Sequence, residues 1–218
     1  MKKYDTKRLV TLAMMAAIAY AAVAFIRIPA VSFLKYEPKD VILVITGFLF
    51  GPLDAMIVTL VVSLVEMVTI SETGPIGLLM NVISSGSFVC IAAAIYYKKR
   101  TLKGALAGLG IGVVLMTVVM LLWNYLITPI YQGVPRSVVA GMLMPVFLPF
   151  NLVKGALNAG ITLLLYKPVV QSLRKAKLVP GGKGNGTGDK KTSIYVTVIA
   201  LFVIATSVLV ILAMSGKI

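Results

Sequence analysis

Three polar residues interrupt one strongly apolar segment in the second half of the chain: Asn151, Lys154 and Asn158. Their spacing of three and then four residues places two amides and an ammonium group on one face of a helix. These groups could hydrogen-bond the polar edge of a small molecule. Polar groups in a hydrocarbon-embedded helix are costly, so we expect this face to meet protein or ligand rather than lipid. Hydrogen bonding between helices, with Lys154 extending outward, would be the explanation without a ligand.

Other apolar segments carry three more polar residues, predicted at the same end of the molecule: Glu66, Asn81 and Asn124. Together with the first three they predict one binding site that opens to the outside. Glu66 could be the counter-ion of Lys154, or simply a solvated helix end.

Catalytic chemistry is not indicated. The chain has no His and a single Cys, so it has no His-based triad and no Cys/His metal site. Its seven acidic residues form no acid/base pair within an apolar segment, and no phosphate-binding loop is present. We therefore expect a binding protein without metal or cofactor rather than an enzyme.

The elements that carry these residues are predicted to be membrane-spanning helices. Hydrophobic residues make up 59% of the chain and its mean hydropathy is +0.99, well above soluble domains. Uncharged runs of about 20 residues recur, the length that crosses a hydrocarbon core. The fold class is therefore an all-α polytopic membrane protein surrounded by lipid.

The net charge of +14 does not indicate nucleic-acid binding, because the basic residues gather at segment ends rather than on a soluble basic face. Basic clusters at residues 2–8, 98–103 and 174–191 instead follow the positive-inside rule. Placing the first two clusters on the same side requires the apolar run 41–70 to be two helices, separated at Gly51-Pro52. The N-terminus is then cytoplasmic and the protein multi-pass in the plasma membrane.

The predicted organisation has three parts. A six-helix substrate-binding membrane domain covers residues 1–178, a Gly- and Lys-rich cytoplasmic linker covers 179–192, and one extra C-terminal transmembrane helix, an added anchor, lies in 193–218. An apolar, Pro-rich segment between the fifth and sixth helices is expected to fold over the outer face. The expected helices are residues 9–28, 38–50, 53–70, 74–97, 104–127, 150–173 and 194–214.

The first helix carries a stripe of small residues, Ala13, Ala17 and Ala21, at intervals of four. Small residues permit close helix approach in a membrane. The stripe could be ordinary packing within the fold or a docking surface for another membrane subunit.

Several short sequences together resemble the substrate-binding S components of energy-coupling-factor (ECF) vitamin transporters, and among them the riboflavin-specific members. The resemblance covers about residues 7–175. The sequences that carry it are Phe33-Leu34-Lys35-Tyr36-Glu37-Pro38-Lys39-Asp40, Gly51-Pro52, Thr73-Gly74-Pro75, Trp123-Asn124-Tyr125 and Leu148-Pro149-Phe150-Asn151-Leu152-Val153-Lys154.

This resemblance implies a six-helix S-component core with a vitamin site near its outer face, and riboflavin contacts at Asn124, Asn151 and Lys154. It also implies docking of the alanine stripe on a transmembrane coupling subunit (T component), with two ATPase subunits completing the importer. The amides of Asn81 and Asn158 could bind the polar edge of riboflavin, and Tyr36, Phe33 and Phe147 could form an apolar slot for its ring. An S component for another vitamin such as thiamin or pantothenate, a membrane enzyme acting on a lipid, and a structural subunit remain alternatives.

Overall fold

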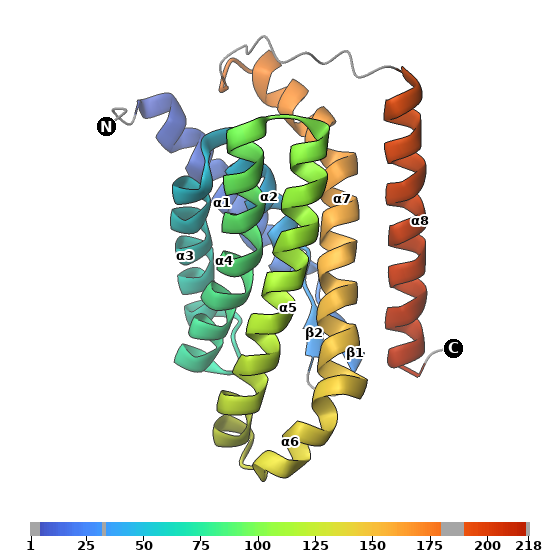
Figure 1. Cartoon of the computed structure of the whole chain (residues 1–218). Helices are drawn as coiled ribbons and strands as arrows, with labels where there is room; N and C mark the ends of the chain where they lie inside the picture. Colours follow the sequence, from blue (N-terminus) through green and yellow to red (C-terminus); the bar gives the residue numbers. More distant parts are fainter. Residues whose placement is uncertain (1–4, 32–33, 180–189, 217–218) are drawn as a thin grey trace.

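A computed structural model describes residues 5–31, 34–179 and 190–216. These residues form helices apart from one short hairpin (Figure 1). Phe33 and most of the predicted linker lie outside the described residues. The elements are α1 (Thr6–Phe25), β1 (Ile28–Val31), β2 (Leu34–Tyr36), α2 (Lys39–Phe50), α3 (Pro52–Thr69), α4 (Gly74–Lys99), α5 (Leu102–Gln132), α6 (Arg136–Met142), the π-helical turn η1 (Leu143–Phe147), α7 (Leu148–Lys175) and α8 (Lys190–Met214).

Six helical segments in the described residues are long and apolar enough to cross a membrane. They are α1, α3, α4, α5, the continuous segment from α6 through α7, and residues 194–214 of α8. The prediction of an all-helical membrane protein is confirmed. Helix α2 has 12 residues, which at 1.5 Å per residue is too short to cross a hydrocarbon core alone.

The apolar run 41–70 is divided into α2 and α3, as the charge pattern predicted. The division lies at Gly51, whose φ of +106° is open to glycine at little cost, and at Pro52, which begins α3. Near this turn, the Arg8 Nε atom donates a 2.8 Å hydrogen bond to the buried carboxylate of Asp54. This ion pair joins the beginning of α1 to the beginning of α3.

Two regions differ from the expectation. The segment between the predicted helices 9–28 and 38–50, for which no regular structure was predicted, forms an antiparallel hairpin in which Ile28 lies opposite Tyr36. Helix α5 continues through Pro129 and ends at Gly133, whose φ is +66°. The separate segment that was expected between the fifth and sixth helices is therefore reduced to α6 and η1, which lead directly into α7. Figure 1 shows α6 at the end of the molecule where the hairpin lies.

The core lies among α1 to α5, around buried residues such as Leu43, Phe88 and Met116. Glycines allow its helices to approach closely. A Cβ atom on Gly47 of α2 would lie 2.6 Å from Ala93 Cβ of α4, so these two backbones are in contact through the glycine.

Helix α8 runs alongside α7 at the edge of the bundle and contacts β1 (Figure 1). It is therefore packed against the rest of the protein, whereas the sequence had suggested only an added anchor.

Candidate ligand-binding site

A buried hydrogen-bonded network joins the hairpin, α2, α4 and α7. The Tyr36 hydroxyl of β2 donates to Asn158 Oδ1 at 2.8 Å, and Asn158 Nδ2 donates to Asp40 Oδ2 at 3.3 Å. Ser85 Oγ donates to Asp40 Oδ1 at 2.6 Å, and Lys154 Nζ lies 3.9 Å from Asp40 Oδ2. The carboxylate of Asp40 is thus the centre of this group, which we call the Asp40 network.

Burial raises the pKa of the Tyr36 hydroxyl, and the negative charge of Asp40 raises it further. The hydroxyl therefore stays protonated over the physiological range. It can act as the donor that the bond to Asn158 requires.

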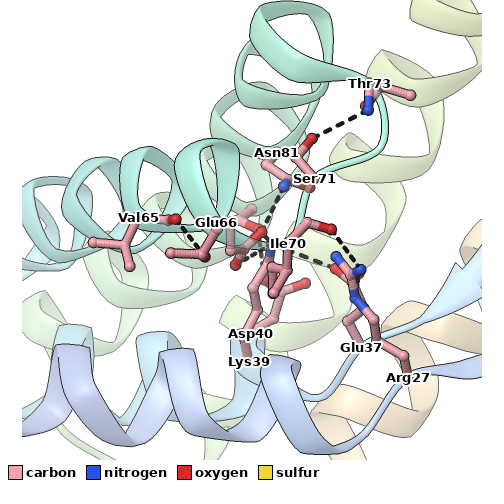
Figure 2. A network of polar contacts seen from close by, with 12 residues as sticks. Arg27, Glu37, Lys39, Asp40, Val65, Glu66, Ile70, Ser71, Thr73 and Asn81 are labelled. Carbon is pink, nitrogen blue, oxygen red and sulfur yellow. Dashed lines mark hydrogen bonds and ion pairs between the residues drawn. The ribbon is translucent and has the colours of Figure 1, made fainter.

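A second group, the Glu66 network, joins the start of α2 to the facing ends of α3 and α4 (Figure 2). Lys39 Nζ donates to both carboxylate oxygens of Glu66, at 2.6 and 2.7 Å, and Asn81 Nδ2 donates to one of them at 2.7 Å. Glu37 lies 3.4 Å from Lys39 Nζ and 3.1 Å from Arg27 Nε. Arg27 also donates to the Ile70 carbonyl at the end of α3, so the network ties both flanks of the hairpin to this helix.

The predicted pairing of Glu66 with Lys154 is wrong. Glu66 binds Lys39, and the carboxylate nearest Lys154 among the described ion pairs is that of Asp40. Glu66 is also not a solvated helix end, since its side chain is 1% exposed. The reason is the hairpin, which brings the start of α2 against the end of α3, so that Lys39 reaches Glu66 first.

The predicted face of α7 is buried, with Asn151 at 3% and Asn158 at 0% exposure. Lys154 and Asn158 join Tyr36 in the Asp40 network. Asn151 does not, because its Nδ2 atom donates to the Phe147 carbonyl of the preceding turn. The structure therefore places two of the three polar residues of this face around Asp40.

Asn124 on α5 is buried and bonded within its own helix. Its Nδ2 donates to the Met120 carbonyl, and its Oδ1 accepts from Thr128. The adjacent Trp123 carries a buried indole N–H that has no hydrogen-bond partner in the described structure. An indole N–H usually finds a partner when buried, so this donor is available to an acceptor of a bound molecule.

Sequence reasoning missed the ionisable residues at the start of α2 and their partners, namely Arg27, Glu37, Lys39, Asp40 and Ser85. In the sequence, Asp40 was noted only as the last residue of the motif Phe33–Asp40 that carries the family resemblance. The available signal was the density of charge in residues 35–40, immediately before a strongly apolar helix. Charged side chains at the start of a buried apolar helix need partners of opposite charge or hydrogen-bond partners inside the protein.

The small-residue stripe of α1 lies on the surface. Ala13 and Ala17 are exposed and Ala21 is partly buried. Elsewhere on the surface, two apolar grooves run along the helices, one between α5 and η1 and the other across α3 and α4. Their linings are nearly all apolar, which suits lipid chains better than a polar ligand.

Comparison with known proteins gives consistent results. The family model described as "ECF transporter, substrate-specific component" matches residues 7–166. The riboflavin transporter RibU of Staphylococcus aureus (strain TCH60) is 32% identical over 185 residues, covering 78% of this chain and 94% of that protein. The riboflavin transporter RibU of Streptococcus thermophilus is 29% identical over 183 residues, covering 78% and 86%.

A solved structure described as "Structure and mechanism of the S component of a bacterial ECF transporter" is also similar. It is 33% identical, with a TM-score of 0.65, and the match covers 77% of this chain and 97% of that chain. The match therefore includes almost the whole of that structure and leaves part of this chain unmatched.

Proposed function

Because this chain belongs to the family of substrate-specific components of ECF transporters, we propose that it captures riboflavin outside the cell for import. Such a component is a non-enzymatic transport subunit that works with a T component and ATPases. The observation that carries the proposal is the buried polar face of α7, where Lys154 and Asn158 meet Tyr36 and Asp40. ATP hydrolysis by two partner subunits would drive delivery inward.

The chemistry of riboflavin suits these side chains. Its imide edge and polyol chain need hydrogen-bond donors and acceptors, and its flat ring needs an apolar surface. Side-chain amides can supply both donors and acceptors, once those of Asn124 and Asn151 exchange their bonds within the helix for bonds to the ligand. The proposed ligand contacts are Tyr36, Glu66, Asn81, Asn124, Asn151, Lys154 and Asn158.

The charge balance of the two networks favours riboflavin over the other vitamins considered. Three carboxylates, from Glu37, Asp40 and Glu66, are paired with three cations, from Arg27, Lys39 and Lys154. A neutral ligand such as riboflavin leaves this balance intact. Thiamin, a cation, or pantothenate, an anion, would add an unpaired charge to a buried site, which is costly.

We further propose that the hairpin end faces outward and the N-terminus lies in the cytoplasm. The start of α1 and the end of α7 lie at the opposite end of the molecule (Figure 1). The basic residues at both positions, such as Lys7 and Arg174, support this orientation. In this orientation α8 crosses the membrane as a helix additional to the six of the S-component core. The short helix α2 is the sixth helix of that core, beside five longer ones.

Binding can be measured in purified protein by titration with riboflavin. Trp123 is the single tryptophan of the chain, so its fluorescence reports from a position next to Asn124. We expect binding to quench both the fluorescence of riboflavin and that of Trp123. Lys154→Met should weaken binding at least tenfold, as for loss of a charged hydrogen bond. The matched control is Lys167→Met, which removes an exposed lysine from the same helix and should leave binding unchanged. Absence of quenching at stoichiometric riboflavin would refute the proposal.

The alanine stripe is proposed to dock on the T component. The exposure of Ala13 and Ala17 supports this, since a face used only for internal packing would be buried. Ala17→Trp should abolish riboflavin uptake by cells while the purified variant still binds riboflavin normally. Uptake at the wild-type rate would contradict the docking proposal.

A further inference from the structure

One face of α8 is specifically packed against α7. Ala200, Ser207 and Ile211 are buried, at 1%, 5% and 5% exposure, and Ile204 is partly buried between them. The spacing of four, three and four residues forms a single stripe along the helix. The opposite face, which includes Phe202 and Leu209, is exposed at 71% and 56%. Along this stripe α8 therefore contacts protein, and it is not surrounded by lipid on all sides.

A glycine on α7 makes the close contact possible. A Cβ atom on Gly160 would lie 3.0 Å from Ile204 Cγ1 and 3.3 Å from the Ala200 carbonyl oxygen. Small residues at such a contact let two helix backbones approach, and the resulting close packing favours helix association in a membrane. The two helices are therefore fitted to each other at this point.

The C-terminal part of α8 reaches the hairpin. Helix α8 contacts β1, and Ile211 belongs to the same buried cluster as Ala30 of β1 and Tyr36 of β2. Phe150 and Leu157 of α7 complete this cluster. The side chain of Tyr36 thus has apolar support from the α8 side, and its hydroxyl bonds Asn158 in the Asp40 network.

We infer that α8 is a clamp that holds the β1–β2 hairpin against the Asp40 network, with Ile211 and Gly160 as positioning residues. A two-stranded hairpin is marginally stable by itself, so its position depends on what it packs against. Helix α8 lies beyond residue 166, where the match to the family model ends, so the clamp is a feature of this chain outside that match. Resting on the proposed function, the clamp slows escape of riboflavin past the hairpin.

The clamp can be tested without any ligand by hydrogen–deuterium exchange of the full chain in detergent. Ile211→Ala should speed exchange in the peptide covering residues 28–36 about tenfold, as expected when buried side-chain atoms are removed from a well-packed contact. Leu209→Ala truncates a residue of equal size on the exposed face of α8 and should leave exchange unchanged. Faster exchange with both variants, or with neither, would overturn the inference.

A second pair of variants separates α8 from α7 without touching the hairpin. Gly160→Val inserts atoms into the α7–α8 contact, whereas Gly110→Val places the same side chain on α5, where a Cβ atom meets nothing within 4 Å. Only the Gly160→Val change should speed exchange of residues 28–36.

Riboflavin dissociation, measured by stopped flow, should also be several-fold faster in Gly160→Val and Ile211→Ala than in their controls. Failure of the wild-type protein to bind riboflavin would refute the proposed function and leave the exchange test of the clamp valid. Normal hairpin exchange in either Gly160→Val or Ile211→Ala would refute the clamp while leaving riboflavin binding standing.

Discussion

The buried ion pair between Lys39 and Glu66 allows a quantitative prediction for the variants Lys39→Met, Glu66→Gln and their combination. Both side chains are 1% exposed, and Lys39 Nζ contacts both carboxylate oxygens at 2.6–2.7 Å. Removing one partner of such a pair leaves a buried charge that has lost its compensation, which costs about 3–5 kcal/mol. An ordinary hydrogen bond between membrane helices contributes only about 0.6 kcal/mol. The stability loss expected for a broken buried ion pair is therefore several times that expected for a lost hydrogen bond.

The other contacts of the two side chains determine how much stability each variant loses. In Lys39→Met the Glu66 carboxylate keeps its 2.7 Å bond from Asn81 but loses its cation, so we expect a loss of about 3 kcal/mol. In Glu66→Gln the ammonium of Lys39 still has Glu37 at 3.4 Å, and the loss should be about 2 kcal/mol. The double variant has no buried charge left over, and the glutamine carbonyl can still accept from Asn81. Its loss should be about 1–2 kcal/mol, and the coupling energy about 3–4 kcal/mol.

The assay is equilibrium unfolding of the purified protein in mixed micelles, followed by circular dichroism. Lys98→Met, which removes an exposed lysine at the end of α4, is the control and should change stability by less than about 0.5 kcal/mol. Additivity of the two single variants in the double variant, within about 0.5 kcal/mol, would refute the reasoning. So would single losses below about 1 kcal/mol, because they would mean that the pair acts as an ordinary membrane hydrogen bond.

Three further predictions concern packing and charge elsewhere in the fold. Gly47→Ala should lower the melting temperature, at a cost of about 1–3 kcal/mol for overpacking against Ala93, whereas Gly110→Ala, with open space at its Cβ, should be neutral or stabilising. Arg8→Gln should cost about 2 kcal/mol in chemical unfolding because the buried Asp54 loses a charged partner; the exposed Lys7→Gln serves as control, and equal effects would contradict this. The hydrogen bond and charge of Lys35 lower the pKa of Glu72, so their pairing stabilises the protein above the unfolded-state pKa of roughly 4.3, and this contribution disappears as the pH falls through the folded-state pKa. The melting-temperature difference between wild type and Lys35→Met should therefore shrink between about pH 6 and pH 3, and a constant difference would contradict this reasoning.

Some parts of this structure follow from local patterns in the sequence. The separation of α2 from α3 depends on Gly51 and Pro52, whose backbone preferences act within one turn. The burial of Asn151 and Asn158 follows from helical periodicity together with the cost of polar groups in lipid. In each case the decisive interactions lie within a few residues or with the solvent, so no knowledge of the neighbouring helices is needed.

The hairpin and the ion pairs could not be predicted in this way. The β1 and β2 strands are four and three residues long, and Pro29 interrupts the pattern, so strand periodicity has too few residues to be recognised. The partner of Glu66 depends on which cation the fold brings nearest. Lys39 and Lys154 are equally plausible from their charge, and only the hairpin, which sets the position of α2, decides between them.

Lys39 and Asp40 are adjacent in the sequence, yet they belong to different networks. On a helix, neighbouring side chains point about 100° apart, so Lys39 turns toward Glu66 of α3 while Asp40 turns toward Ser85 and Asn158. The chain immediately before them contributes Tyr36 to one network and Glu37 to the other. A displacement of the hairpin therefore strains both networks at once, because Tyr36 belongs to one network and Glu37 to the other. Opening of the site should accordingly be cooperative, with the two networks separating together rather than in sequence.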